Sequence, residues 1–267
     1  MGRPSPSEFN DKKMDRLITE EAYSAFAERG CVRLPGFLPP ESAEPAMQRV
    51  QRVLARAAPS DSVTAVRERL KPLARLPEFS TLLTLEVRQC ASELAGGQTL
   101  SEPVDRPQIL FTPPDASIWT VPHKIWHLDI PRLGAVGLVG VQMFTFLDKV
   151  AAGGGGTVVV AGSHRLLNDE GRIRSKDVKR RLSKEAYFQD LFNGALPDRE
   201  RFIDEIGHLE DVPLQVVEFT GEPGHVYFSD LRVLHSLAAN ARNAPRLMLT
   251  QRFFATEEIG ALYAGET

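Results

Sequence analysis

The chain has 267 residues with 32 basic and 35 acidic side chains, and its net charge of −3 gives no overall attraction to nucleic acid or to an anionic membrane surface. Its hydrophobic content of 42% is typical of a globular protein and excludes extensive disorder. The length fits one or two domains, and all-β barrels often reach it as one, so we expect a single domain over residues 16–267.

The sequence has none of the usual signals of a secreted or membrane protein. Residues 1–15 are polar and lack the apolar core of a signal peptide, so we interpret them as a flexible leader. The longest apolar stretch, Leu133–Leu147, is too short to cross a bilayer as a helix. The two cysteines, Cys31 and Cys90, form no disulfide framework. We therefore expect a cytoplasmic protein.

Helices are expected in the first third of the chain. The pattern predicts a helix over Thr19–Arg29, with Thr19 as its N-cap and Gly30 at its end, followed by a strand and turn over Cys31–Leu38. Two further segments show helical patterns, Glu41–Ala58 and Ser80–Leu94.

From Pro107 onward the pattern changes to that of a β protein. Short runs of β-branched and aromatic residues alternate with glycine and proline turns, which predicts an antiparallel sandwich or barrel. The expected strands are Gln108–Thr112, Trp119–Val121, Val136–Leu147, Thr157–Val160, Leu214–Phe219, His225–Phe228 and Leu247–Phe254. Residues 166–211 interrupt this series with a charged, helical pattern, so we expect a helical insertion there.

One histidine and one aspartate stand two residues apart, at His127 and Asp129. Residues i and i+2 of a strand lie on one face, so a strand over 125–129 would present both side chains together. We expect His235 as a third ligand, since a set of two histidines and one carboxylate suits Fe(II) and leaves coordination positions open. Arg246 begins the strand after His235, and adjacent antiparallel strands would bring both residues to one pocket. Arginine is also the preferred bidentate partner for the carboxylate of a 2-oxo acid.

Four motifs in this order resemble the phytanoyl-CoA dioxygenase family of Fe(II)/2-oxoglutarate oxygenases. They are the helix-strand opening of residues 17–38, Trp126-His127-Leu128-Asp129, the glycine-rich segment of residues 155–165 that contains Gly-Ser-His, and His235 with Arg246. Each motif is weak alone, but together they cover about residues 17–40 and 106–254 and form a specific signal.

The resemblance implies a fold that is mainly β with flanking helices, namely a double-stranded β-helix, also called a jelly roll and found in cupins. It implies that His127, Asp129 and His235 bind iron and form the catalytic centre. The implied cofactors are Fe(II), 2-oxoglutarate and O2, with ascorbate as a stimulant.

The same resemblance implies the residues that bind 2-oxoglutarate. Arg246 would pair with its distal carboxylate, and Thr157 would lie near the cosubstrate. Thr112 stands where many members of the family carry a lysine, so a contact from this residue would differ from theirs. Gln142 completes the expected cofactor-binding set.

The retained Asp129 favours hydroxylation of an unactivated C–H bond, because related halogenases replace this carboxylate with a small residue. Epimerisation, cyclisation and desaturation need the same iron ligands and stay open as alternatives. A non-catalytic, cupin-like metal-binding protein is an alternative of another class. The composition, rich in proline, arginine and alanine, indicates a bacterial gene with a role in natural-product biosynthesis.

The expected partner is a small-molecule substrate, with Trp126 and His164 as candidate pocket residues. Seven basic residues of the insertion between Arg172 and Lys184 form either a solvated helix face or a lid that recruits an anionic substrate, linked to CoA or to a carrier protein. The acidic pI of about 6.1 and the lack of an aromatic-basic pattern disfavour a nucleic acid as partner.

Overall fold

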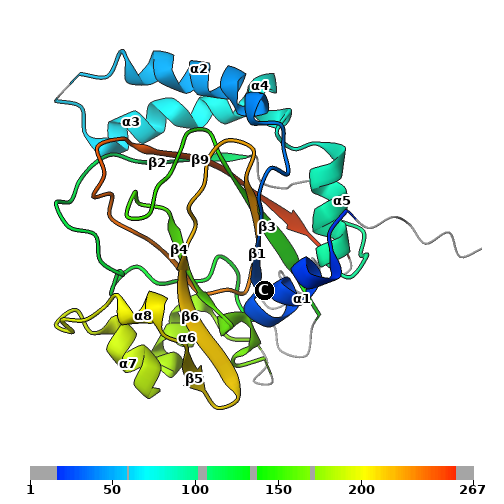
Figure 1. The fold of residues 1–267 in the computed structure, drawn as a ribbon, viewed down its shortest axis with the longest axis vertical. Coiled ribbons are helices and arrows are strands. Elements are labelled where there is room, and N and C mark those ends of the chain that lie inside the picture. The colour runs from blue at the N-terminus through cyan, green and yellow to red at the C-terminus, as the bar shows by residue number, and fades with distance from the viewer. Residues whose placement is uncertain (1–16, 59, 102–106, 133–136, 169–171, 257–267) are drawn as a thin grey trace, which may run out of the picture.

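The computed structural model describes residues 17–58, 60–101, 107–132, 137–168 and 172–256. The expected leader, residues 1–15, lies outside the described residues. Two antiparallel sheets form the centre of the molecule, with helices on both sides (Figure 1). The expected jelly roll with flanking helices is confirmed.

The major sheet has the strand order β1-β7-β3-β9-β2. These strands are β1 (Cys31–Leu34), β7 (Val226–Asp230), β3 (Gly140–Phe146), β9 (Arg246–Phe254) and β2 (Gln108–Thr112). The minor sheet has the order β5-β6-β4-β8. Its strands are β5 (Gly207–Leu209), β6 (Val212–Glu218), β4 (Thr157–Ala161) and β8 (His235–Leu237).

Successive side chains of each strand point to opposite faces of its sheet: one face is directed toward the other sheet, and the other face packs against helices. In β9, Leu247, Leu249 and Phe253 pack into the cluster that contains the N-terminal helices. Met248 belongs to a second cluster with Val159 of the minor sheet, so this face of β9 points between the sheets. Arg246, Thr250 and Arg252 share that inward face, because each lies an even number of residues from Met248.

The N-terminal helices cover the outer face of the major sheet. They are α1 (Glu20–Arg29), α2 (Glu44–Leu54), α3 (Val63–Leu70), α4 (Pro77–Ser80) and α5 (Leu85–Leu94), with 3-10 turns at Pro40–Ala43 and Lys71–Arg75. Helix α1 begins and ends as predicted: the Thr19 hydroxyl accepts from the amide of Ala22 at 3.2 Å, and Gly30 adopts φ 71°. Among the described residues no helix is long and apolar enough to cross a membrane.

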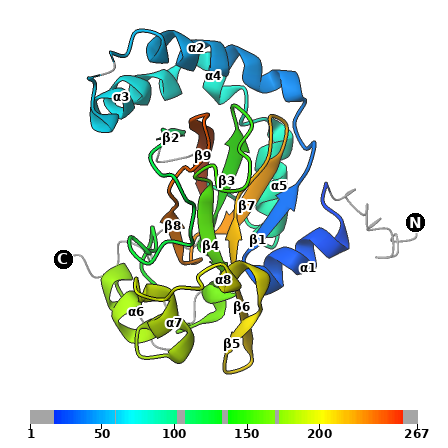
Figure 2. The ribbon, with the colours of Figure 1, turned by 60° about the vertical axis from the view of Figure 1, so that its left-hand side comes forward.

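The insertion covers the outer face of the minor sheet (Figure 2). It contains α6 (Ser175–Leu182), α7 (Ala186–Phe192), α8 (Arg201–Asp204) and strand β5, after a 3-10 turn at Ser163–Arg165. Buried Val178, Phe188 and Phe202 pack against Val158 and Val160 of β4. In the described structure the insertion is thus a packed layer behind the minor sheet.

Three expectations from the sequence were wrong in detail. Residues Trp119–Val121 are irregular, and the segment 125–129 forms no strand beyond a single bridge at His127. In addition, β8 pairs with β4 of the minor sheet, whereas β9 belongs to the major sheet. His235 and Arg246 therefore lie in different sheets and are not on adjacent strands.

Candidate metal centre

A pair of backbone hydrogen bonds joins the segment of His127 to strand β8. The amide of His127 donates to the carbonyl of His235 at 2.9 Å, and the reverse bond measures 3.0 Å. The two imidazole rings consequently lie with their centroids 4.3 Å apart. Ile125, just before, has φ 62°, an unusual value for a β-branched residue that turns the chain into this bridge. Tertiary pairing, not a continuous strand, thus places the first histidine.

Both imidazoles are oriented by backbone carbonyls. Nδ1 of His127 lies 2.8 Å from the carbonyl oxygen of Ile125, and Nδ1 of His235 lies 3.1 Å from that of Val233. Since a carbonyl only accepts, Nδ1 of each ring is the donor, so the neutral form of either ring carries its lone pair on Nε2. This arrangement is the usual one around histidines that bind a metal.

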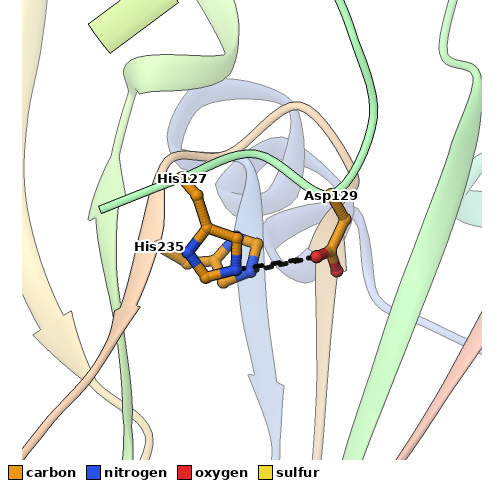
Figure 3. Close-up of side chains that lie close together, drawn as sticks. All are labelled: His127, Asp129 and His235. Atoms are coloured by element: carbon orange, nitrogen blue, oxygen red, sulfur yellow. Dashed lines mark ion pairs between the residues drawn. The ribbon is translucent and has the colours of Figure 1, made fainter. Parts of the chain in front are cut away.

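Asp129 completes the group of three side chains (Figure 3). Its Oδ1 lies 3.7 Å from Nε2 of His127 and 3.6 Å from Nε2 of His235. One ligand atom from each residue lies within 4.8 Å of the others. The structure therefore brings together the three residues expected from the sequence, although they come from an irregular segment and a short strand.

The protonation states suit a metal. Burial opposes ionisation of Asp129, but His235, Arg252 and His127 outweigh it, so the pKa of the carboxyl lies well below its usual range. Burial and the neighbouring His235 lower the pKa of His127, which keeps this imidazole neutral at pH 7. An imidazole nitrogen from each histidine and one carboxylate oxygen form a donor set that fits Fe(II).

A cavity of about 130 Å³ adjoins these ligands. Both sheets line it, with Gln108, Leu110, Gln142, Phe144, Thr250 and Arg252 from the major sheet and Thr157, His235, Ser236 and Leu237 from the minor sheet. None of the described residues of the insertion lines this cavity. Gln142 is buried, and its Nε2 donates to Oγ1 of Thr250 at 3.0 Å. The cavity is therefore mixed in character, with polar groups near the candidate ligands.

Arg246 is a buried cation without a bonded acid. Its exposed fraction is 2%, its Nη1 donates to Oγ1 of Thr157 at 3.3 Å, and its Nε has no partner among the described residues. Burial and the nearby Arg67 lower its pKa to about 10. The acid whose charge acts on Arg246, Glu218, is held by the amides of Gly153 and Gly156 at 2.8 and 3.2 Å. A buried guanidinium in this state fits an anionic ligand.

Two expected pocket residues lie elsewhere. Trp126 donates from Nε1 to the carbonyl of Pro122 at 2.8 Å and packs in the apolar cluster of the insertion. His164 is buried, and its Nε2 lies 3.0 Å from the carbonyl of Ala27, at the end of α1. Neither residue lines the cavity beside the ligands, so neither has the position that the sequence analysis expected.

Sequence reasoning missed Arg252. This residue contacts Asp129 through Nε and Nη2, both directed at Oδ2. A signal existed in the sequence: Arg252 stands six residues after Arg246, an even spacing that places both side chains on one face of the strand.

No protein-family model matches the sequence, and no curated protein matches it. The fold is similar to that of SnoK, a non-heme alpha ketoglutarate dependent carbocyclase from nogalamycin biosynthesis, with 21% identity, a TM-score of 0.56, and coverage of 89% of this chain and 84% of SnoK. It is similar to the epimerase SnoN in complex with Fe3+, alpha ketoglutarate and nogalamycin RO, with 18% identity, a TM-score of 0.54, and coverage of 88% and 82%. The fold is also similar to that of EctD from S. alaskensis, solved with 2-oxoglutarate and 5-hydroxyectoine, with 17% identity, a TM-score of 0.59, and coverage of 96% of this chain and 82% of EctD. At these identities the similarity shows a shared fold.

Proposed function

We propose that this chain is an Fe(II)- and 2-oxoglutarate-dependent oxygenase that hydroxylates an unactivated C–H bond of a small molecule. The observation that carries the proposal is the convergence of His127, Asp129 and His235, with both Nε2 atoms within 3.7 Å of one carboxylate oxygen. The fold shared with SnoK, SnoN and EctD supports it, as does the order of the four sequence motifs that resemble the phytanoyl-CoA dioxygenase family.

The chain would supply binding and orientation, and bound iron with 2-oxoglutarate and O2 would supply the oxidising chemistry. His127, Asp129 and His235 would hold the iron. Arg246 would hold the distal carboxylate of the cosubstrate, because its buried Nε needs an acceptor that the described residues do not provide. Thr157 already touches Arg246 and would share that ligand.

The substrate class is narrowed by the lining of the cavity. Phe144, Leu110 and Leu237 offer apolar contacts, while Gln108 and Gln142 offer hydrogen bonds, which suits a compact molecule with both kinds of surface. The basic residues of the insertion lie outside the cavity lining, so nothing in the site supports linkage to CoA or to a carrier protein. A role in natural-product biosynthesis, in the cytoplasm, is the accompanying proposal.

Cyclisation or epimerisation is the second candidate. It is supported by SnoK and SnoN, which share the fold with this chain and act as carbocyclase and epimerase. The metal ligands would be the same in either case, so analysis of the product by mass spectrometry and NMR separates these outcomes from hydroxylation.

The proposal is tested with purified protein, Fe(II), ascorbate and 2-oxoglutarate, by measuring succinate. The wild type should form succinate slowly without a substrate, whereas His127→Ala and Asp129→Ala should form none above the metal-free background. His208→Ala is the matched control, because His208 is exposed on β5 outside the cavity. Normal turnover in the ligand variants would refute the site, and a wild type that binds Fe(II) without any turnover would favour a non-catalytic metal-binding protein.

A further inference from the structure

The two carboxylate oxygens of Asp129 have different neighbours. Oδ1 faces Nε2 of His127 and of His235, at 3.7 and 3.6 Å. Oδ2 receives the guanidinium of Arg252, with Nε at 3.1 Å and Nη2 at 2.9 Å. One oxygen is therefore directed to the candidate metal position, and the other is occupied by an arginine.

We propose that Arg252 is a positioning residue, which fixes the side-chain rotamer of Asp129 so that Oδ1 alone is presented to the metal. This inference rests on the metal site of the proposed function. Arg252 is not itself a ligand, since arginine stays protonated, and it acts through the carboxylate.

The local structure explains why Asp129 needs such a contact. The segment of Asp129 lies outside the regular strands, and the amide of Leu128 next to it donates to a side chain, Oγ of Ser175, at 2.9 Å. Arg252, by contrast, stands in the long strand β9, directly across from Gln142 of β3. A side chain anchored on the rigid sheet therefore restrains a ligand on an irregular segment, and the planar guanidinium does so through two donors.

Electrostatics alone predicts the opposite effect on metal binding. A guanidinium beside a ligand oxygen repels a divalent cation, so its removal should tighten binding if charge were all that mattered. If Arg252 acts by positioning, its removal should weaken binding, and loss of a partner that orients a ligand typically costs about 10- to 100-fold in metal affinity. The sign of the change therefore distinguishes the two roles.

The experiment is a titration of the full chain with Co(II) and with Mn(II), without oxygen or 2-oxoglutarate, in competition with a chromophoric chelator. Arg252→Met should bind each metal about 10- to 100-fold more weakly than the wild type. Arg252→Lys should recover only part of the affinity, because an ammonium cannot reproduce the two-donor contact. The visible spectrum of bound Co(II) should also change in both variants, which a purely structural role at a distance would not produce.

Arg201→Met is the matched control, since Arg201 forms an ion pair with Asp190 at 2.5 Å on the insertion, outside the cavity lining. Its metal affinity should equal that of the wild type. Metal binding by Arg252→Met that equals or exceeds that of the wild type overturns the proposal. Full wild-type affinity in Arg252→Lys also overturns it. If thermal unfolding shows that Arg252→Met does not fold, the Arg252→Lys variant alone decides the test. A wild type that binds neither metal overturns the metal site itself.

Discussion

Thr112 and Arg246 face each other across the β2–β9 pair, and each keeps one buried polar atom without a partner among the described residues. These atoms are Oγ1 of Thr112 and Nε of Arg246. Buried polar atoms are rarely left unpaired in folded proteins, so two of them on neighbouring residues indicate a place for a ligand with acceptor oxygens. In the proposed function, a carboxylate of 2-oxoglutarate would satisfy both donors.

Replacement of Arg246 should therefore weaken 2-oxoglutarate binding strongly. We expect Arg246→Met to raise the dissociation constant by about 10- to 100-fold, which corresponds to the 1.5–3 kcal/mol of a hydrogen bond to a charged group. Thr112→Val, which keeps the shape of the side chain and removes the hydroxyl, should raise it by a few fold. Calorimetric titration of the Mn(II)-loaded protein measures both values.

The shape of the ligand provides a control for this prediction. Pyruvate has the 2-oxo acid group but no distal carboxylate, so the wild type and Arg246→Met should bind it with equal affinity. If Arg246→Met weakened the binding of pyruvate as much as that of 2-oxoglutarate, the arginine would support the fold of the site and would not bind the distal carboxylate.

The sequence predicted the elements that depend on local chemistry. Helix α1 follows from its capping residues Thr19 and Gly30, and strand β9 from a largely apolar run that ends in two phenylalanines and follows the turn residue Pro245. The residues of the candidate metal site were also predictable, because His127, Asp129 and His235 are chemically distinctive. The capping and strand signals lie within a few neighbouring residues, whereas the prediction of the metal ligands also used the order of motifs that are far apart in the sequence.

The means by which the ligands converge could not be predicted in the same way. His127 is placed by a bridge to His235, more than a hundred residues away, and the chain reaches it through the left-handed conformation of Ile125. Strand β8 has three residues, too few for a clear alternating pattern. The place of the insertion depends on which sheet face its apolar residues cover, and no local pattern specifies that face.

Two glycines at positive φ allow a direct test of crowding at the end of α1. Gly30 has φ 71°, and a Cβ there would lie 2.4 Å from Nδ1 of His164 and 2.6 Å from Cγ2 of Val233. Gly36 has φ 63° with nothing within 4 Å. Gly36→Ala should lower the free energy of unfolding by about 1–2 kcal/mol, from the left-handed backbone conformation alone. Gly30→Ala should lower it by at least about 1 kcal/mol more, because the added Cβ overlaps with His164 and Val233. Urea unfolding at pH 7 compares them; equal costs would show that the neighbours of Gly30 move without penalty.

The burial of His164 should make stability depend on pH. Burial is the main cause that lowers the pKa of this imidazole, and the charges of Arg232 and Arg132 lower it further. Asp230 and the hydrogen bond to the Ala27 carbonyl act in the opposite direction but do not outweigh these effects. The unfolded chain takes up this proton near pH 6.5, before the folded protein does. The contribution to stability is therefore complete above about pH 6.5 and is lost as the pH falls toward the folded pKa.

His164→Gln should remove that part of the acid sensitivity, since a glutamine amide can still donate to the Ala27 carbonyl but does not titrate. The difference in unfolding free energy between wild type and variant should be constant from about pH 7 to 8 and should shift in favour of the variant as the pH falls to about 5. The pKa of His127 is also lowered, but His127 is present in both proteins, so its effect on the free energy of unfolding cancels in the difference. A difference that does not change with pH would mean that His164 titrates normally in the fold.

Arg132 connects the segments that carry Asp129 and His235. Its exposed fraction is 1%, and its guanidinium donates to the carbonyls of His164 at 3.0 Å and of Ser163 at 2.5 Å. Oγ of Ser163 in turn accepts from the amide of Leu234 at 2.9 Å, one residue before His235. Burial lowers the pKa of Arg132 to about 10, so the side chain remains charged at pH 7 and makes charge-assisted bonds.

Loss of this arginine should therefore affect both stability and the metal site. Arg132→Met leaves two turn carbonyls without their charged donor and should lower the unfolding free energy by about 3 kcal/mol. Ser163→Ala should cost about 1 kcal/mol, and because Arg132 and Ser163 share one turn, a double-mutant cycle should give a coupling of about 0.5–3 kcal/mol. The same variants should bind Co(II) more weakly than the wild type, since the turn supports Leu234 beside His235. Additive stability changes together with unaltered Co(II) affinity would show that the turn and the metal ligands are independent.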